Sequence, residues 1–243
     1  MPWIASGCGT SSTRFARSSG RMDSKMSDSR RDHGVLPDLA EVIAVTCGSY
    51  EARADEYADA TEDYAKFPGL RDEVAAFEKA LPPGLPVLDL GCGGGRDGRL
   101  LADLGRRVLA ADFSMAMLRC ARSRSPGRHA LRFVRLNMLD LPFADDRFAG
   151  TWACGSLLHL PSTQFPRVLS EILRTLAPGG TAAISMRAGT GEHWRDGGTL
   201  AGRRWFTLVD PGDFASRMER AGFRRVRLQH TGRQNWFVAL GEK

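Results

Sequence analysis

The stretch 87-VLDLGCGGGRDG-98 determines how the chain is expected to fold. Its apolar start, residues 87–90, predicts a short buried strand. Four glycines within residues 91–95 then allow the backbone to turn sharply and to come close to a ligand. Residues 96–104 predict a helix with leucines along one side. A strand, a glycine turn and a helix N-terminus in this order direct free N–H groups at an electron-rich ligand.

The glycines can be read in two registers. Gly93, Gly95 and Gly98 match the G-x-G-x-x-G pattern of dinucleotide-binding proteins. Gly91, Gly93 and Gly95 form a competing G-x-G-x-G pattern, which places Asp89 two residues before the first glycine. A carboxylate at the end of an apolar strand suits a ligand with a cationic amino group and repels a pyrophosphate. The alternative is that Asp89 accepts N–H bonds from its own turn.

The segment DLGCGGG, residues 89–95, resembles the first motif of the class I S-adenosylmethionine-dependent methyltransferases. The resemblance implies a doubly wound α/β fold, with a mostly parallel seven-stranded sheet, helices on both faces and a C-terminal antiparallel hairpin. It also implies that S-adenosyl-L-methionine is the cofactor. The cofactor contacts that it implies in this motif are Asp89, Gly91, Cys92, Gly93 and Gly95.

The second predicted strand, residues 107–112, ends in Asp112. An acidic residue at this place can accept hydrogen bonds from both ribose hydroxyls of a nucleoside, in either class of ligand. The alternative is that Asp112 helps to cap the helix that follows. Phe113 and Met117 are expected to flank the adenine ring.

The third predicted strand, residues 131–136, leads into a segment that ends in Leu-Pro-Phe. Members of the family usually carry an Asp four residues before this Leu, where it accepts from the adenine amino group. This chain has Asn137 there, and an amide carbonyl can still accept one hydrogen bond. A different register would give the role to Asp140. Met138 next to Asn137 is also expected at the cofactor.

The fourth predicted strand, residues 148–153, delivers the segment CGSLLHLP to its carboxyl end. Ligands of open α/β sheets bind at such ends. The segment resembles the fourth motif of the family in its small-molecule enzymes, which implies that Ala153 and Cys154 contact the cofactor. His159 is the candidate general base and a substrate contact, with an expected ionisation near neutral pH. The alternative is a structural histidine at the start of a helix.

Residues 35–85 predict a helical segment before the central strand. Ser49 is expected to cap a helix that carries Tyr50, Tyr57 and Tyr64 on one face, because a seven-residue spacing drifts only ~20° per step. This segment is similar to a helix that closes over the cofactor as a lid in many family members. The similarity implies that Tyr57 contacts the cofactor and Tyr50 the substrate. The alternative is an aromatic stripe that packs on the core.

Ser162 is expected to cap a helix over residues 164–176, and residues 177–180 are expected to end it before a strand at 181–186. Residues 187–205 then predict a long loop rich in Gly and Arg. A loop of this length in a compact domain is usually functional. Its cationic and aromatic residues, among them Arg187 and Trp205, indicate an acidic or planar substrate; the alternative is a solvated flexible loop.

Composition limits the other classes of function. The net charge of +6 lies partly in residues 1–34, which hold six Lys/Arg and three Asp/Glu, so the remainder carries +3 and does not favour nucleic acid as a partner. Residues 1–34 lack apolar periodicity and predict disorder. No apolar run approaches the ~20 residues of a membrane span. The five cysteines are scattered, which predicts neither disulfides nor a metal site and fits a cytoplasmic protein.

The expected organisation is therefore a disordered extension (1–34), a helical lid segment (35–85) and a methyltransferase domain (86–243), active as a monomer or homodimer. The expected reaction is methyl transfer to an oxygen or nitrogen nucleophile of a small molecule. A tRNA or rRNA methyltransferase is the alternative that the charge supports. A nicotinamide-dependent oxidoreductase is supported only by the G-x-G-x-x-G register.

Overall fold

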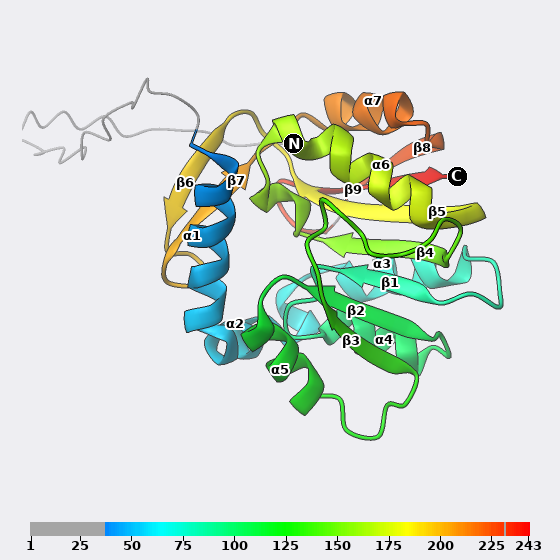
Figure 1. The fold of residues 1–243 in the computed structure, drawn as a ribbon, viewed down its shortest axis with the longest axis horizontal. Helices are drawn as coiled ribbons and strands as arrows, with labels where there is room; N and C mark the ends of the chain where they lie inside the picture. The colour runs from blue at the N-terminus through cyan, green and yellow to red at the C-terminus, as the bar shows by residue number, and fades with distance from the viewer. Residues whose placement is uncertain (1–36, 231) are drawn as a thin grey trace, which may run out of the picture. The chain divides into compact units, whose positions relative to one another are not determined.

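The computed structural model describes residues 37–230 and 232–243 (Figure 1). These residues contain a seven-stranded sheet in the order β3-β2-β1-β4-β5-β9-β8. Strands β1 to β5 are parallel, and β9 runs antiparallel to both β5 and β8. The predicted sheet and its terminal hairpin are confirmed. The sheet consists of β1 (Val87–Leu90), β2 (Val108–Asp112), β3 (Leu131–Arg135), β4 (Phe148–Cys154), β5 (Leu176–Arg187), β8 (Arg224–His230) and β9 (Trp236–Glu242).

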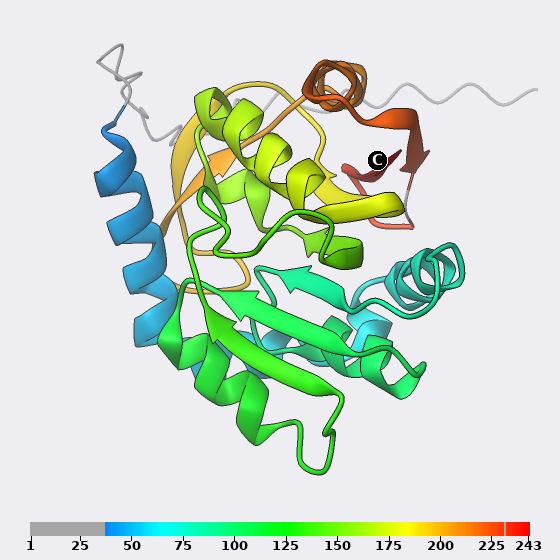
Figure 2. The same cartoon turned by 45° about the vertical axis from the view of Figure 1, so that its right-hand side comes forward.

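Helices cover both faces of this sheet (Figures 1 and 2). The helices are α1 (Leu39–Ala52), α2 (Ala54–Thr61), α3 (Leu70–Lys79), α4 (Arg96–Asp103), α5 (Met115–Ser123), α6 (Phe165–Thr175) and α7 (Pro211–Ala221). Among the described residues, none of the helices has both the length and the apolar character that crossing a membrane requires. The predicted disorder of residues 1–34 falls outside the described residues.

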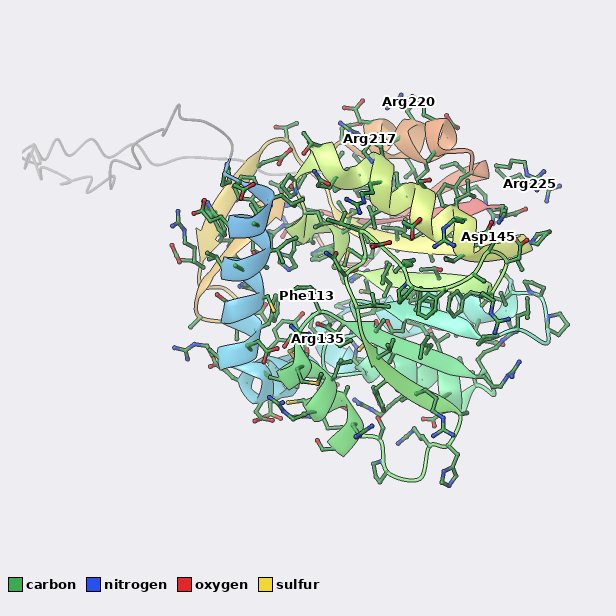
Figure 3. The ribbon with its side chains drawn as sticks, viewed as in Figure 1. Phe113, Arg135, Asp145, Arg217, Arg220 and Arg225 are labelled. Atoms are coloured by element: carbon green, nitrogen blue, oxygen red, sulfur yellow. The ribbon has the colours of Figure 1, made fainter. Side chains whose placement is uncertain are left out.

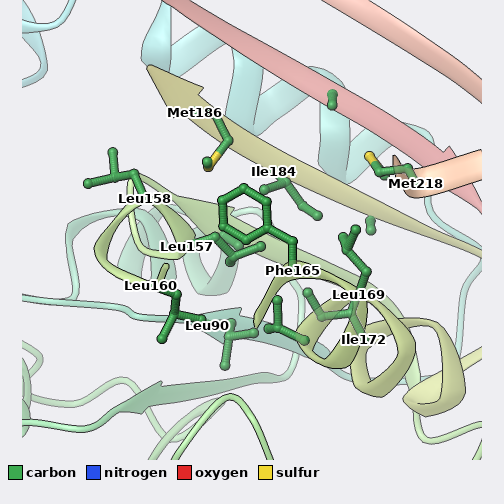
Figure 4. Packing of buried hydrophobic residues seen from close by; sticks show 14 of the residues in the cluster. Leu90, Leu157, Leu158, Leu160, Phe165, Leu169, Ile172, Ile184, Met186 and Met218 are labelled. Carbon is green, nitrogen blue, oxygen red and sulfur yellow. The ribbon is translucent and has the colours of Figure 1, made fainter. Parts of the chain in front are cut away.

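Alternation along β1 places its residues in two different hydrophobic clusters of the core, one on each face of the sheet. Leu88 and Leu90 belong to a cluster with α6 and α7, in which Phe165 is fully buried (Figure 4). Val87 belongs to a second cluster with α3 and α4, in which Phe77 is 1% exposed. Successive strand residues point to opposite faces, so a four-residue strand buried on both sides reads as a continuous apolar run. The exception in this run is Asp89, which points towards the α4 side.

The turn after β1 requires glycine for two reasons. Gly91 has a φ of +78° and Gly95 a φ of +77°, in the left-handed region that side chains disfavour. A Cβ at Gly91 would also lie 2.3 Å from the Cβ of Ser156, so no other residue fits there. Gly95 is the N-cap of α4. The turn therefore brings the start of α4 and the end of β4 close to the same point.

The predicted helix with three tyrosines on one face is wrong. The chain leaves helical geometry at Arg53, between α1 and α2. Ser49 does not cap a helix but lies inside α1, where its hydroxyl donates to the Arg203 carbonyl at 2.7 Å. Tyr64 lies in a separate 3-10 turn, and its hydroxyl donates to Asp97 Oδ1 at 2.8 Å. Hydrogen bonds to distant parts of the chain override the local periodicity.

Two predicted boundaries after β4 are also wrong. Residues 177–180 do not end α6 as a loop but belong to β5, where they form an irregularity in the pairing with β4. A Cβ at Gly180 would lie 2.8–3.2 Å from three backbone carbonyl oxygens, which explains the glycine. Ser162 does not cap a helix with its side chain, because its hydroxyl donates to Glu192 and a 3-10 turn precedes α6.

The predicted loop over residues 187–205 contains a strand and leads into another. Strands β6 (Glu192–Asp196) and β7 (Arg203–Thr207) form an antiparallel hairpin of their own. Trp194 pairs with Trp205 across this hairpin, with ring centroids 5.3 Å apart and edge to face. Such cross-strand aromatic pairs stabilise two-stranded ribbons. The hairpin lies beside α1 (Figure 1), so two segments about 150 residues apart in the chain share one edge of the molecule.

Candidate active site

Two adjoining cavities lie at the carboxyl ends of β1, β2 and β4. The first cavity encloses about 860 Å³ of empty space, part of it open to solvent, and is mostly apolar. The second cavity is more polar and extends towards β5 and the β6–β7 hairpin. Both are lined by Tyr50, Tyr57, Gly91, Gly93, Cys154, Gly155 and His159. The two cavities therefore meet at the glycine turn, as expected for an open α/β sheet.

Asp112 lies in the first cavity at the end of β2. Its Oδ2 accepts from the Gly93 N–H at 2.9 Å, and its Oδ1 accepts from the Ser114 N–H at 2.9 Å. Burial raises the pKa of Asp112, although these backbone N–H groups oppose the shift. A carboxylate has about four acceptor positions, so acceptor capacity remains for a ligand. The adjacent helix α5 is capped by Ser114, which accepts from Met117 N, so Asp112 is not needed as its cap.

The ring of Phe113 is held in place beside this carboxylate. The Arg135 guanidinium lies 5.4 Å from the ring centroid, and Arg135 Nε donates to the Phe113 carbonyl at 3.0 Å (Figure 3). Phe113, Met117 and Met138 all line the first cavity. Their apolar surfaces can enclose a flat aromatic group such as a purine.

Asn137 also lines the first cavity, whereas Asp140 is exposed and lines neither of the two cavities. The side-chain carbonyl of Asn137 accepts from the Leu139 N–H at 3.0 Å. The amide therefore stabilises its own turn, and a second lone pair on the same oxygen remains for a ligand.

Asp89 is buried in the second cavity at 2% exposure. Burial, reinforced by Asp97 and Asp112, raises the pKa of Asp89 well above its usual value. Its Oδ2 has no hydrogen-bond partner among the described residues. A Cβ at Gly98 would lie 2.8 Å from that oxygen, so Gly98 makes space for this carboxylate. A buried carboxylate with an unused oxygen favours a cationic ligand over a pyrophosphate.

His159 and Tyr50 form a hydrogen-bonded pair between the two cavities. His159 Nδ1 lies 2.7 Å from the Trp205 carbonyl, which can only accept, so this nitrogen carries the proton. His159 Nε2 is then an acceptor and lies 2.9 Å from the Tyr50 hydroxyl. Burial lowers the pKa of His159 to about 4. The expected ionisation near neutral pH is therefore wrong, because desolvation keeps this imidazole neutral.

The two tyrosines expected in the lid segment lie at the boundary of the cavities. Their rings are 5.0 Å apart and edge to face, and burial raises the pKa of both phenols. Arg204 Nη1 donates to the Tyr50 hydroxyl oxygen at 3.3 Å. The Tyr50 hydroxyl therefore accepts from a guanidinium and donates to an imidazole.

Three of the expected site residues line neither cavity. Gly95 packs against Ala121, and Ala153 is fully buried in the core. Trp205 is 3% exposed, and its indole N–H donates to Thr207 Oγ1 at 3.1 Å. Cys92, Cys154 and Arg187 do line the second cavity. Trp205 reaches the site only through its backbone carbonyl, which holds His159.

A buried network around Asp97, which the sequence did not predict, lies beside the second cavity. Its carboxylate accepts from Tyr64, from Trp152 Nε1 at 3.0 Å and from Arg96 Nε at 2.8 Å. Arg96 also donates to the Thr61 carbonyl at 2.7 Å. This network ties the segment before α3 to the start of α4. Trp152 comes from a continuous apolar strand, so nothing in the local pattern marks it as a hydrogen-bond donor.

Cationic residues were expected over residues 187–205, but the β6–β7 hairpin that brings two of them to the second cavity was not. Arg195 and Arg204 project from β6 and β7, and Trp236 stands at the start of β9. The alternation of aromatic and basic residues in 192-EHWRD-196 and 203-RRWFT-207 was the available signal, because it indicates a hairpin. Within residues 37–230 and 232–243, no group of three His, Cys, Asp or Glu could hold a metal ion.

Comparison with known proteins gives a family match over the central strands. Residues 87–180 match a family model described as a methyltransferase domain. The demethylmenaquinone methyltransferase of Clavibacter sepedonicus is 38% identical over 111 residues, which cover 45% of this chain and 44% of that protein. The 2-phytyl-1,4-naphtoquinone methyltransferase of Thermosynechococcus vestitus is 40% identical over 107 residues, which cover 43% of this chain and 47% of that protein. The chain thus spans less than half the length of these relatives.

Among solved structures, the fold is similar to the 1,6-didemethyltoxoflavin-N1-methyltransferase of Burkholderia thailandensis. The TM-score is 0.67 at 24% sequence identity, and the match covers 86% of this chain and 92% of that chain. That structure contains 1,6-didemethyltoxoflavin and S-adenosylhomocysteine. At this level of identity the likeness concerns the fold.

Proposed function

From the match of residues 87–180 to a methyltransferase-domain family model, we propose that the chain is a class I S-adenosylmethionine-dependent methyltransferase that methylates an oxygen or nitrogen nucleophile of a small molecule. When bound, S-adenosylmethionine supplies a methyl group that its positive sulfur has already activated. The protein then has to position the acceptor in line, exclude water and, where the acceptor needs it, receive a proton.

The observation that carries the proposal is the position of Asp112 in an apolar cavity. Its remaining acceptor capacity suits the ribose hydroxyls, and Phe113 and Met117 beside it suit the adenine. Asp89, with an unpartnered oxygen in the adjoining cavity, suits the amino group of the methionine part. These residues would hold the cofactor across the glycine turn, and the junction of the two cavities would receive the methyl acceptor.

Tyr50 and Tyr57 would form one wall of the space around the reacting atoms. Within residues 35–85, the segment expected to act as a lid, α1 would be the helix that closes over the cofactor. Support for this role comes from the contacts of α1 with both sides of the site. Glu51 accepts from the N–H groups of Met115 and Ala116 at the start of α5. Thr46 Oγ1 accepts from the Trp205 N–H at 3.1 Å on β7. In this arrangement His159 positions Tyr50, and its catalytic role as a base stays a prediction.

The experiment is calorimetric titration of S-adenosylhomocysteine, the reaction product, into the wild type and Asp112→Ala. Loss of a buried acceptor should weaken binding by ~1–3 kcal/mol. Asp140→Ala, an exposed carboxylate on the following loop, is the matched control and should bind as the wild type does. Binding of NADH by the wild type, or equal affinity of the two variants, would contradict the proposal.

A further inference from the structure

The second cavity contains a group of arginines that the cofactor site does not use. Arg187 lies at the end of β5, Arg195 on β6 and Arg204 on β7, and all three line the cavity. In the part of the chain that the structure describes, none of the three forms an ion pair with a carboxylate. Arg233, which lines the same cavity, is paired with Glu73 at 2.8 Å. Arg187, Arg195 and Arg204 are the "arginine group" below.

Arg204 is the buried member of the arginine group. It is 4% exposed, and its Nη2 donates to the Gly197 and Leu200 carbonyls at 2.7 and 3.1 Å. Its Nη1 donates to the Tyr50 hydroxyl oxygen, its Nε has no hydrogen-bond partner among the described residues, and the guanidinium lies over the Tyr50 and Phe206 rings. All of these partners are neutral. Burying a guanidinium without a counter-charge is costly, so the site favours an anion that would supply one.

Arg195 converges on the same point. It pairs with Arg204 in the register of the hairpin, and a Cβ at Gly198 would lie 3.6 Å from Arg195 Nη2 and 3.8 Å from Arg204 Nη2. Two guanidinium groups are therefore neighbours over one glycine. Like charges this close repel, and a bound oxyanion would remove the repulsion with charge-assisted hydrogen bonds.

We propose that the methyl acceptor is a planar oxyanion, carrying a carboxylate or phosphate group that Arg195 and Arg204 bind. The inference rests on the proposed methyltransferase function. Trp236 lines the same cavity and offers an aromatic surface to the planar part of the acceptor. The Tyr50 hydroxyl, bonded to Arg204, links the anion site to the junction where the methyl group would be transferred.

The test uses the complex with S-adenosylhomocysteine and three defined probes at constant ionic strength. Calorimetry compares 2-naphthoate, 2-naphthyl phosphate and the uncharged 2-naphthamide. We expect at least one anion to bind tenfold or more tightly than the amide, and the ratio of the two anions identifies carboxylate or phosphate as the preferred group. Equal binding of the amide, or no binding of either anion, would overturn the inference.

Three variants locate the anion site. Arg195→Met and Arg204→Met should each weaken binding of the preferred anion tenfold or more and leave that of S-adenosylhomocysteine unchanged. Arg203→Met is the matched control, since Arg203 is exposed, lines neither cavity and lies over the Trp194 ring. The Arg195 guanidinium has no hydrogen bond to a described residue and lies over the Phe206 ring, so its variant remains informative if Arg204→Met loses stability.

Anion affinity that is equal in Arg195→Met and the wild type would overturn the placement of the site. Failure of the wild type to bind S-adenosylhomocysteine would instead contradict the proposed function, which separates the two conclusions.

Discussion

At the scale of single residues, the site depends on groups whose charge is set by burial. Asp89 and Asp112 are both desolvated, and the pKa of each is raised. His159 is desolvated too, and its pKa falls to about 4. Burial always favours the neutral form, so it moves acids and bases in opposite directions. A cationic ligand near these two carboxylates would lower their pKa values again, because it stabilises their charged form. The same attraction would strengthen the binding of the ligand.

The pKa of His159 makes stability depend on pH. Its pKa is near 6.5 in the unfolded chain and about 4 in the folded protein, so the unfolded state binds more protons between these values. Folding stability should therefore fall as the pH drops from 6.5 towards 4, by on the order of 2–3 kcal/mol for this group. Above pH 6.5 its contribution is fully present.

Urea unfolding of the wild type and His159→Asn at pH 7.5 and 4.5 checks this prediction. The wild type should lose more stability between the two pH values than the variant does. His129→Asn is the control, because His129 is exposed. Parallel losses in the wild type and His159→Asn would show that this imidazole is not kept neutral by the fold.

Gly91 should be the least replaceable residue of the central turn. A Cβ there would lie 2.3 Å from the Cβ of Ser156, in addition to the φ of +78°. Gly91→Ala should cost ~2–4 kcal/mol of stability and weaken S-adenosylhomocysteine binding, through strain and overpacking together. Gly105→Ala has a comparable φ of +95° but open space around the Cβ, so it isolates the backbone cost of ~1–2 kcal/mol. Equal melting curves for the two variants would refute the steric argument.

At the scale of elements, α1 connects the two sides of the site. Glu51 supplies the negative charge at the N-terminus of α5, where free N–H groups and the helix dipole favour it. Glu51→Ala should lower stability by ~1 kcal/mol and weaken S-adenosylhomocysteine binding a few-fold, because the lid loses one attachment. Glu56→Ala is the control, as Glu56 is exposed and, within residues 37–230 and 232–243, forms an ion pair with the exposed Arg53 alone. Unfolding and calorimetry measure both effects, and an unchanged affinity would argue against a lid function.

The elements that the sequence predicted well are those with local causes. The pattern of residues 87–98 alone predicts the strand, the turn and the start of the helix, and the structure contains all three. The errors share a different cause. Ser49 and Ser162 bond to Arg203 and Glu192, far along the chain. A serine before a helix predicts a cap only if no distant partner competes for its hydroxyl.

The candidate site also contains residues whose positions follow from the local sequence and residues whose positions depend on distant parts of the chain. Asp89 lies within β1, Asp112 ends β2 and Asn137 follows β3, and all three line the cavities at the carboxyl ends of these strands. Trp205 was expected to contact substrate, but strand alternation points its indole away from the cavities and leaves Arg204 and Phe206 to line the second one. That outcome depends on the β6–β7 register, which a one-residue shift would reverse.

At the scale of the whole molecule, the site is assembled from two halves. The first cavity is formed mainly around β1 to β3, and the second reaches β5, β9 and the β6–β7 hairpin. Helix α1 bridges them, since Thr46 and Ser49 bond to β7 while Glu51 bonds to α5. A ligand in the first cavity should therefore stabilise the hairpin as well, because coupling through a shared element acts in both directions.

Hydrogen exchange with and without S-adenosylhomocysteine tests this coupling. Saturation at about 100 times the dissociation constant should stabilise the protein by ~2.7 kcal/mol. Amides of residues 39–52 and 192–207 should gain protection together, although the hairpin lies outside the first cavity. In a Thr46→Val, Ser49→Ala double variant, protection should persist in α1 and weaken in the hairpin, because two side-chain bonds from α1 to β7 are gone and only the bond between Tyr50 and Arg204 remains of the three. Undiminished protection of the hairpin in this variant would mean that the bonds of Thr46 and Ser49 do not transmit the effect.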